Sequence, residues 1–211
     1  MFLVLFSIIS SSLGALTNTY SGINAFVTSY GYIAIFVLMT LEYVSLPIPS
    51  EIVLPLIGLF AAKGTLSFFP ALGVVVVAGI VGIFIDYYIA YFLGKDVVYA
   101  HAEKFHISKQ RLDDFDVWFA RNGKFAVFMA RLIPVVRGLI SLPAGFAKMK
   151  KSAFLLYSVA GSLIWDVVLM LFGYYGLASN NAYLVLTAIG VFGLAIYVVY
   201  KFAISRIKKK N

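Results

Sequence analysis

Residues 42–51 read EYVSLPIPSE and residues 131–138 read RLIPVVRG, and these two stretches decide the fold. In both, prolines and ionisable side chains separate apolar arms that are shorter than the about 20 residues of a membrane-spanning helix. Proline prevents a continuous regular helix through either stretch. Broken backbone at membrane depth is tolerated only where it is buried in protein or lines a wet cavity. We therefore expect two re-entrant helical hairpins, at 31–64 and 125–148.

The composition around these stretches is that of a membrane protein. Of the 211 residues, 62% are hydrophobic and 12% are charged, against about 25% charged in a typical soluble domain. These values exclude an ordinary soluble globular protein and, because disorder needs low hydrophobicity, a disordered chain. The absence of cysteine excludes disulfides, thiolate nucleophiles and thiolate metal sites. The formal net charge of +8 indicates basic loops that face anionic lipid rather than a nucleic-acid partner.

The rest of the chain continues this pattern as a single membrane domain. Each hairpin precedes a long apolar span that carries one carboxylate, so we predict an all-α polytopic protein with oppositely oriented hairpins and an internal inverted repeat. The other expected segments are an N-terminal apolar segment at 1–28, spans at 71–94, 153–178 and 183–201, a cytoplasmic amphipathic segment at 95–124 and a basic tail at 202–211.

The basic residues predict the orientation. If both hairpins re-enter, 14 of the 17 Lys and Arg residues fall on one side, in 95–124, 148–151 and 201–211, and only Lys63 faces the other. The positive-inside rule places the first side, with the C-terminus, in the cytoplasm. Full spans in place of the hairpins would scatter these loops to both sides, so the charge bias favours re-entry independently of the prolines. The topology of the N-terminus stays open.

Ionisable side chains inside the apolar segments are the candidate site. They are Glu42, Glu51, Asp86, Arg131, Arg137 and Asp166. A charge at the bilayer centre costs roughly 2.5–3.5 kcal/mol on insertion scales, so these groups must face inward, pair or change protonation state. The break at Pro134 lets Arg131 and Arg137 converge on one anion, and guanidinium is the natural donor to phosphate. In the alternative interpretation, the two arginines only neutralise carboxylates as internal struts.

Other polar groups are interpreted as structural. His101 and His106 are five residues apart, unlike the i, i+4 pair that binds a metal on a helix, and are taken as surface residues. The acidic run at 113–116 lacks a cation-binding loop motif and fits a solvated helix face. We therefore expect neither a metal nor a cofactor. Tyr87 can donate a hydrogen bond to Asp86 or anchor its span at the interface.

The order and spacing of these residues resemble the DedA family, the SNARE-associated or VTT-domain membrane proteins. The resemblance covers about residues 31–178 and is carried by Glu42, 47–51, Gly58, Asp86 with Tyr87, 128–137, 143–145, Trp165 and Gly173. It implies two opposed re-entrant hairpins and lipid translocation that depends on proton motive force. Bacterial members are implicated in returning undecaprenyl phosphate across the membrane, and related members move phospholipids.

The resemblance also implies roles for particular residues. It points to Glu42, Glu51, Arg131 and Arg137 as the functional set, with Asp86 close behind. Two positions depart from the family pattern, and both are treated as accessory together with Tyr87. Ser50 stands where many members have glycine in a Pro-x-Pro-Gly-Glu motif, and Asp166 stands where an uncharged residue is expected.

We expect a proton-coupled transporter that moves polyprenyl (undecaprenyl) phosphate across the cytoplasmic membrane, and not an enzyme. Arg131 and Arg137 are expected to bind the phosphate, and Glu42, Glu51 and Asp86 to gate it or carry the proton. The expected partners are the lipid, protons and the bilayer, without nucleic acid, and a homo-oligomer is compatible with the sequence.

The alternatives are a proton or cation exchanger, a phospholipid scramblase of the same superfamily, a lipid phosphatase and a scaffold. A phosphatase is disfavoured because cysteine is absent and both histidines lie outside the membrane segments. A scaffold would leave the six buried charges unexplained.

Overall fold

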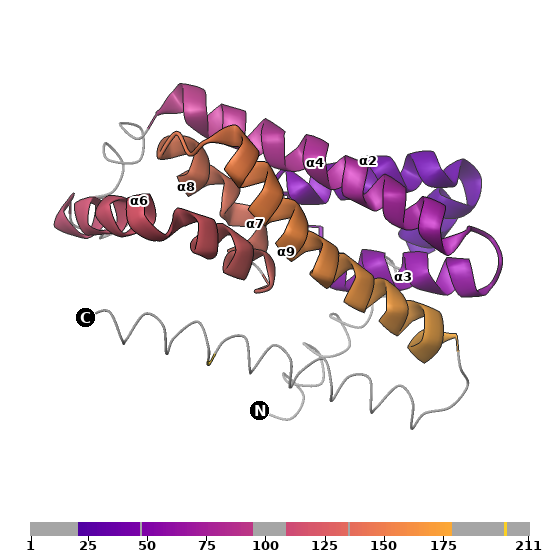
Figure 1. The fold of residues 1–211 in the computed structure, drawn as a ribbon. Helices are drawn as coiled ribbons and strands as arrows, with labels where there is room; N and C mark the ends of the chain where they lie inside the picture. The colour runs from indigo at the N-terminus through magenta and orange to yellow at the C-terminus, as the bar shows by residue number, and fades with distance from the viewer. Residues whose placement is uncertain (1–20, 47, 95–108, 135, 179–200, 202–211) are drawn as a thin grey trace, which may run out of the picture.

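The computed structural model describes residues 21–46, 48–94, 109–134, 136–178 and 201, and every regular element within these ranges is helical (Figure 1). The helices are α2 (Tyr32–Tyr43), α3 (Ser50–Ala62), α4 (Phe68–Leu93), α6 (Lys109–Arg131), α7 (Val136–Leu139), α8 (Ser141–Phe146), α9 (Lys151–Leu171) and the π-helix η2 (Phe172–Leu177). Residues 21–30 are also helical. The all-α class is confirmed for this part of the chain. Residues 183–200 of the expected span at 183–201, the tail at 202–211, His101 and His106 lie outside the described residues.

A proline lies in each of the two breaks between helices. α2 ends at Tyr43, and α3 begins at Ser50 after Pro49, which has extended backbone angles (φ −75°, ψ 104°). α6 ends at Arg131, and Pro134 lies in the turn before α7. A proline lacks the N–H that would continue the helix, and it disfavours helical angles at the residue before it. The local sequence therefore dictates both breaks.

One expected boundary is not a helix end. We expect an amphipathic segment to 124 and a separate hairpin arm from 125, but α6 runs without interruption over Lys109–Arg131. Residues 109–124 carry the charged side chains and 125–130 are apolar, so the composition changes along one helix. Helical hydrogen bonds do not require a uniform face, and a change of environment along a helix leaves its backbone continuous.

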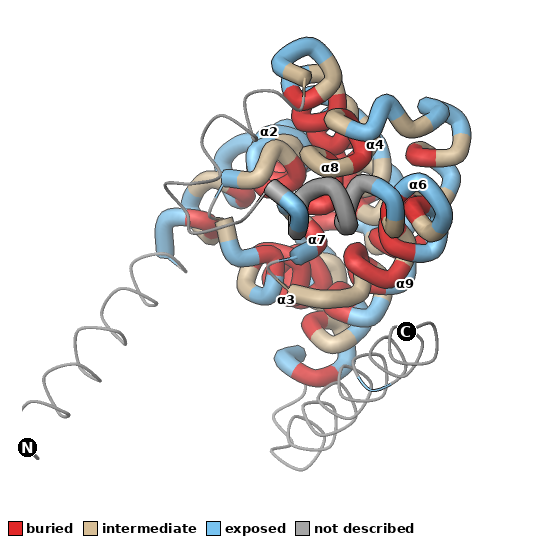
Figure 2. The backbone as a smooth tube through the Cα atoms, turned by 90° about the vertical axis from the view of Figure 1, so that its left-hand side faces the viewer, coloured by how far each residue is buried: buried red, intermediate tan, exposed pale blue. Residues whose placement is uncertain are grey.

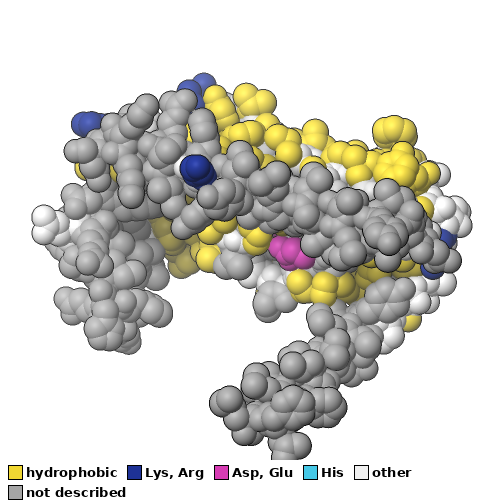
Figure 3. All heavy atoms as spheres, turned by 90° about the horizontal axis from the view of Figure 1, so that it is seen from below, with side chains coloured by type: hydrophobic (Ala, Val, Ile, Leu, Met, Phe, Trp, Pro, Cys, Tyr) yellow, Lys and Arg dark blue, Asp and Glu magenta, His cyan; other side chains and the backbone are white. Residues whose placement is uncertain are grey.

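Two helices are long and apolar enough to cross a membrane, α4 over Phe68–Leu93 and α9 with η2 over Lys151–Leu177. The 26 residues of α4 extend about 39 Å, more than the ~30 Å of a hydrocarbon core. Their outward faces are apolar, as in Phe92 (79% exposed) and Leu156 (65%). Seen from below, hydrophobic side chains cover much of the described surface (Figure 3). Apolar surface of this extent is expected to face lipid or a partner.

The two long helices have matching contacts. α4 packs against α2 and α8, whereas α9 packs against α6 and α3, and η2 packs against α3 (Figure 1). The pair formed by α2 and α3 precedes α4, and the pair that begins with α6 and ends with α8 precedes α9. Each long helix therefore contacts the first helix of the pair that precedes it and the last helix of the other pair. Their inward faces are buried together in one core, drawn in red in Figure 2.

Glycines allow the closest of these contacts. A Cβ atom at Gly58 in α3 would meet the carbonyl oxygen of Met170, and one at Gly173 in η2 would meet the carbonyl oxygen of Pro55. In both cases the obstructing atoms belong to the backbone. The position of η2 against α3 therefore depends on the absence of side chains at these two residues.

Candidate functional site

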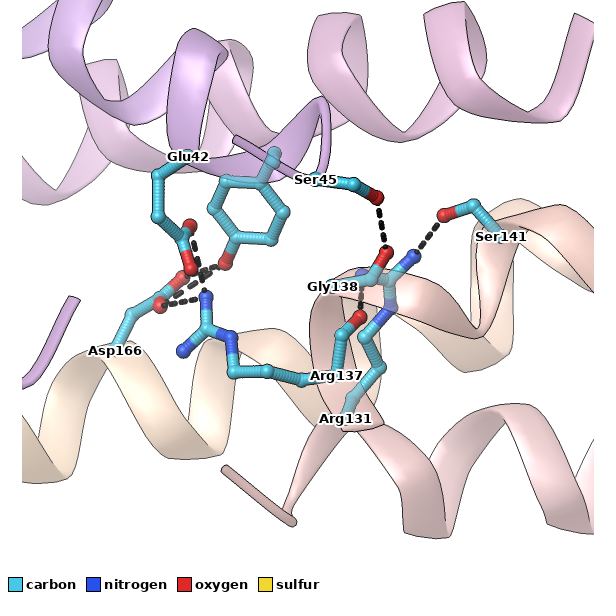
Figure 4. Close-up of polar contacts among 8 residues, drawn as sticks. Glu42, Ser45, Arg131, Arg137, Gly138, Ser141 and Asp166 are labelled. Atoms are coloured by element: carbon cyan, nitrogen blue, oxygen red, sulfur yellow. Dashed lines mark hydrogen bonds and ion pairs between the residues drawn. The ribbon is translucent and has the colours of Figure 1, made fainter. Parts of the chain in front are cut away.

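The two helix breaks meet in the interior (Figure 4). The Ser45 hydroxyl, just after α2, donates to the Gly138 carbonyl in α7 at 2.8 Å. Nη2 of Arg137 donates to Oε2 of Glu42, at the end of α2, at 3.2 Å. Residues nearly a hundred positions apart in the sequence are thereby brought into one polar cluster, and two of them belong to the predicted site.

Arg137 lies between two carboxylates. Its Nη2 atom is 3.2 Å from Glu42 and 3.7 Å from Oδ1 of Asp166, and all three side chains are buried. The hydroxyl of Tyr43 lies 3.0 and 2.8 Å from the two Asp166 oxygens and donates to that carboxylate. The guanidinium also lies over the rings of Tyr43 and Trp165, at 5.0 and 5.4 Å. A buried ion pair needs such additional contacts to offset the loss of hydration.

Two nitrogens of this guanidinium remain unpaired. Nε and Nη1 of Arg137 are buried and have no hydrogen-bond acceptor among the described residues. A buried donor without an acceptor destabilises a protein by about 1–3 kcal/mol, and by more when it is charged. These donors lack an acceptor, and a planar guanidinium is suited to a phosphate or a carboxylate.

A cavity of about 400 Å³, called the central cavity below, adjoins Arg137. Its polar wall is formed by Glu42, Ser45, Ser50, Glu51 and Arg137. Glu51 is exposed at the start of α3, whereas Ser50 is buried. This volume suits a small headgroup.

Arg131 has a different position. Its side chain is fully buried and does not line the cavity. Nη1 of Arg131 donates to the carbonyl of Arg137, and Nη2 donates to Oγ of Ser141 at 2.7 Å (Figure 4). Both guanidiniums lie near the Tyr43 ring, but they are directed at different groups. In this arrangement Arg131 holds the turn that presents Arg137, and the two do not converge on one point.

Asp86 belongs to a neighbouring contact. It is buried in α4 and accepts a hydrogen bond from the Ser45 hydroxyl, which also lies against the Gly138 carbonyl. A hydroxyl has one proton, so Ser45 can donate fully to only one of these acceptors at a time. Tyr87 does not bond to Asp86, because its hydroxyl donates to the Met149 carbonyl at 2.6 Å.

Sequence reasoning did not identify four residues of this site. Tyr43 and Ser45 directly follow Glu42 at the break, and that adjacency is the signal that could have found them. Ser141 and Trp165 enter through tertiary contacts with the arginines, and of the two only Trp165 is among the residues that carry the family resemblance. Asp166, expected to be accessory, lies in the centre of the cluster.

Ser45 offers a direct test of this geometry. Its backbone is in the left-handed region (φ 58°), which disfavours every residue except glycine. Ser45→Ala loses the hydroxyl and keeps the strain, so we expect its free energy of unfolding to fall by about 2 kcal/mol. Ser45→Gly also loses the hydroxyl but relieves the strain, and should lose about half as much. Thermal unfolding of the purified variants in detergent measures both, and equal losses would contradict the role of the backbone.

The fold and the cluster define a helical membrane protein with a buried arginine–carboxylate site at two helix breaks. Residues 48–175 match the VTT domain family. A Staphylococcus aureus protein named undecaprenyl phosphate transporter A is 33% identical over 186 residues, which cover 86% of this chain and 91% of that protein. The chain therefore belongs to the VTT-domain (DedA) family, as the order of its motifs predicts.

Of two further relatives, one has the same name as the Staphylococcus aureus protein and the other has a different name. A Bacillus subtilis protein, also named undecaprenyl phosphate transporter A, is 33% identical over 153 residues, 72% of this chain and 75% of that protein. A Lactococcus lactis protein named alkaline phosphatase-like protein is 31% identical over 155 residues, 68% of this chain and 70% of that protein. No solved structure is significantly similar to the chain.

Proposed function

We propose that this protein transports undecaprenyl phosphate, or a closely similar polyprenyl phosphate, across the cytoplasmic membrane, and that it is not an enzyme. The observation that carries the proposal is the buried Arg137, a residue that lines a cavity and whose guanidinium has two donors without acceptors among the described residues. Phosphate oxygens are the natural acceptors for such a group. The transporter names of two relatives support this assignment over the phosphatase-like name of a third.

The cavity wall suits a lipid as well as its phosphate. Beside the polar residues it contains Leu46 and Leu139, which are 46% and 50% exposed. These side chains lead from the cavity to the apolar exterior. A polyprenyl chain cannot dissolve in a water channel, so it leaves sideways into the bilayer while the phosphate occupies the cavity.

The charges of the cluster provide a reason for proton coupling. Glu42 and Asp166 balance Arg131 and Arg137, so the four groups are formally neutral when all are ionised. A phosphate that binds Arg137 competes with Glu42 and adds negative charge to a buried site. A proton taken up by a carboxyl group would offset that charge. Proton uptake therefore accompanies phosphate binding in our proposal.

Two further carboxylates are placed to serve this exchange. Glu51 is exposed on the cavity wall and can take up a proton from water, beside the buried Ser50. Protonated Asp86 could donate to Ser45, which would then donate to Gly138, so that all three groups are bonded in series. We assign Glu42 and Glu51 to gating and proton transfer and Asp86 to modulation. Arg131 stabilises the turn that carries Arg137, because its guanidinium donates to the Arg137 carbonyl.

The matching contacts of α4 and α9 support a polytopic topology with an inverted repeat. Each long helix contacts the first helix of its own pair and the last helix of the other. Two re-entrant hairpins inserted from opposite sides would produce this pattern, with their tips meeting where Ser45 and Arg137 lie. In this topology the basic segments and the C-terminus face the cytoplasm.

Proteoliposomes test the function against its alternatives. With a fluorescent polyprenyl phosphate in the bilayer, we expect the wild type to accelerate its movement between leaflets, and a pH gradient to increase the rate. Glu51→Gln should keep the fold, because this residue is exposed, and should reduce the effect of the gradient by about tenfold. Lys63→Gln, also exposed, is the control.

The same vesicles distinguish the alternatives. Cation flux driven by the pH gradient without lipid movement would contradict lipid transport and favour an exchanger. Equal movement of phosphatidylcholine and polyprenyl phosphate would favour a scramblase. Release of inorganic phosphate from the lipid would indicate a phosphatase.

A further inference from the structure

A second cavity, of about 510 Å³, lies between α6 and the turn that joins α8 to α9. It shares no lining residue with the cavity at the helix breaks. The proposed transport mechanism uses none of its side chains. It is therefore a separate feature of the fold, and its own chemistry must indicate what it binds.

Three cations surround this cavity. Arg121 and Lys124 come from α6 and Lys150 from the turn before α9, and all three are exposed. No acidic side chain lines it among the described residues. Phe119, only 3% exposed, and the partly buried Met149 form apolar wall further inside. A cationic rim over an apolar interior favours an anionic group that is attached to an apolar chain.

The surroundings place the cavity at the level of a membrane interface. Nζ of Lys148 lies 5.4 Å from the centre of the Tyr91 ring, and Nζ of Lys151 lies 4.8 Å from that of Tyr88. Tyrosine and lysine together are typical of the boundary between lipid and water. In Figure 3 the visible Lys and Arg side chains lie mainly toward the left, beside hydrophobic surface.

Exposed apolar side chains lie close to the cavity along both helices. Phe125 directly follows Lys124 in α6 and is 37% exposed. Leu156 is 65% exposed and lies one turn beyond Ala153, which lines the cavity. A lipid whose phosphate lay among the cations would have apolar surface for its chains on either side. Free inorganic phosphate would not use this surface.

We propose that this cavity binds the phosphate group of an anionic lipid at the membrane interface. Arg121, Lys124 and Lys150 contact the phosphate, and the chains lie along Phe125 and Leu156. The transported polyprenyl phosphate and an anionic phospholipid share this chemistry, and the experiment below distinguishes them. The inference does not rest on the proposed function, because the site can hold a lipid whatever the central cavity transports.

Binding to the full chain in uncharged detergent tests the site. The probes are farnesyl phosphate, dioctanoyl phosphatidylglycerol and inorganic phosphate, measured by titration calorimetry and counted by native mass spectrometry. In the triple variant Arg121→Gln/Lys124→Gln/Lys150→Gln, we expect one bound lipid to be lost or its affinity to fall by at least about tenfold. The control Lys63→Gln/Lys201→Gln removes two exposed cations that do not line the cavity and should bind like the wild type.

Each outcome bears on the proposal. Unchanged lipid binding by the lining variant, or an equal loss in the control variant, would overturn it. Displacement of the lipid by inorganic phosphate at the same concentration would overturn the assignment to a lipid. Tighter binding of farnesyl phosphate identifies the transported lipid as the ligand, and tighter binding of phosphatidylglycerol identifies a bulk phospholipid. A transport failure of the wild type beside intact binding here would contradict the proposed function alone.

Discussion

Arg137→Ala should abolish polyprenyl phosphate transport, with a fall in rate of at least about 100-fold. The variant removes the side chain of Arg137, a residue that lines the central cavity and whose guanidinium has two donors without acceptors among the described residues. It also leaves Glu42 and Asp166 buried next to each other without their cation. Breaking a buried ion pair in this way destabilises a protein by about 3–5 kcal/mol. The transport measurement must therefore be separated from a loss of folding.

A neutral version of the cluster makes that separation. The double variant Arg137→Met/Glu42→Gln removes the cation and the carboxylate nearest to it, so the remaining Asp166 and Arg131 keep the cluster formally neutral. Neutral replacement of a buried ion pair is often without cost to stability. We expect this variant to unfold close to the wild-type temperature and still to transport at the rate of empty liposomes. Transport at the wild-type rate by this double variant would contradict a phosphate site at Arg137.

Arg137→Lys refines the same test. Lysine keeps the charge but loses the planar fork that contacts phosphate through two nitrogens. We expect it to retain most of the stability and less than about a tenth of the transport rate. If lysine transported as well as arginine, a simple charge would suffice at this position. The unpaired Nε and Nη1 donors would then be irrelevant to the substrate.

Gly58→Ala and Gly173→Ala should each destabilise the fold by about 3 kcal/mol or more. In both variants the new methyl group meets backbone atoms of the facing helix, those of Met170 and Tyr174 for Gly58 and those of Pro55 for Gly173. A side chain can rotate away from a clash, but a backbone can yield only if the helix moves. α3 and η2 must then separate. This separation removes the packing that positions Ser50 and Glu51 at the start of α3.

Gly73→Ala is the matched control for these substitutions. Gly73 also lies within a long helix, α4, but a Cβ atom there has no neighbour within 4 Å. Alanine is favoured over glycine in a helix by about 1 kcal/mol, so this variant should be neutral or slightly stabilised. Thermal unfolding in detergent and the yield from the membrane fraction measure all three variants. A neutral Gly58→Ala would contradict the close approach of α3 and η2.

Local sequence predicted the helix breaks well because proline acts on its own backbone and on the residue before it. Pro49 accordingly stands directly before α3 and Pro134 lies in the turn between α6 and α7, whereas Pro55 is accommodated inside α3. The apolar length of α4 and of α9 with η2 was readable for a similar reason, since the span of a helix depends only on its number of residues. The boundary at 124 failed because a change in composition does not break helical hydrogen bonds.

The roles of the two arginines could not be read in this way. Both flank Pro134, and residue type and spacing make them equivalent as ligands for one anion. The structure directs Arg131 to the Arg137 carbonyl and Ser141, and leaves Arg137 beside the cavity. Asp166 likewise is predicted from the sequence as an accessory residue, and the structure makes it a partner of Arg137 and Tyr43. These assignments depend on which distant segments pack together.

The sequence by itself determined that this protein is a helical membrane protein of the VTT-domain family, that its helices break at two prolines, and that charged residues lie at those breaks. The family is indicated by the order of its motifs, and the other properties follow from composition, helix length and the covalent geometry of proline, which act locally. Only the tertiary structure decided that the breaks meet, that Arg137 faces a cavity while Arg131 supports its turn, and that Asp166 completes the cluster. Those outcomes arise from contacts between segments far apart in the chain, because a buried charge is stable only beside a partner of opposite charge or a hydrogen-bonding group.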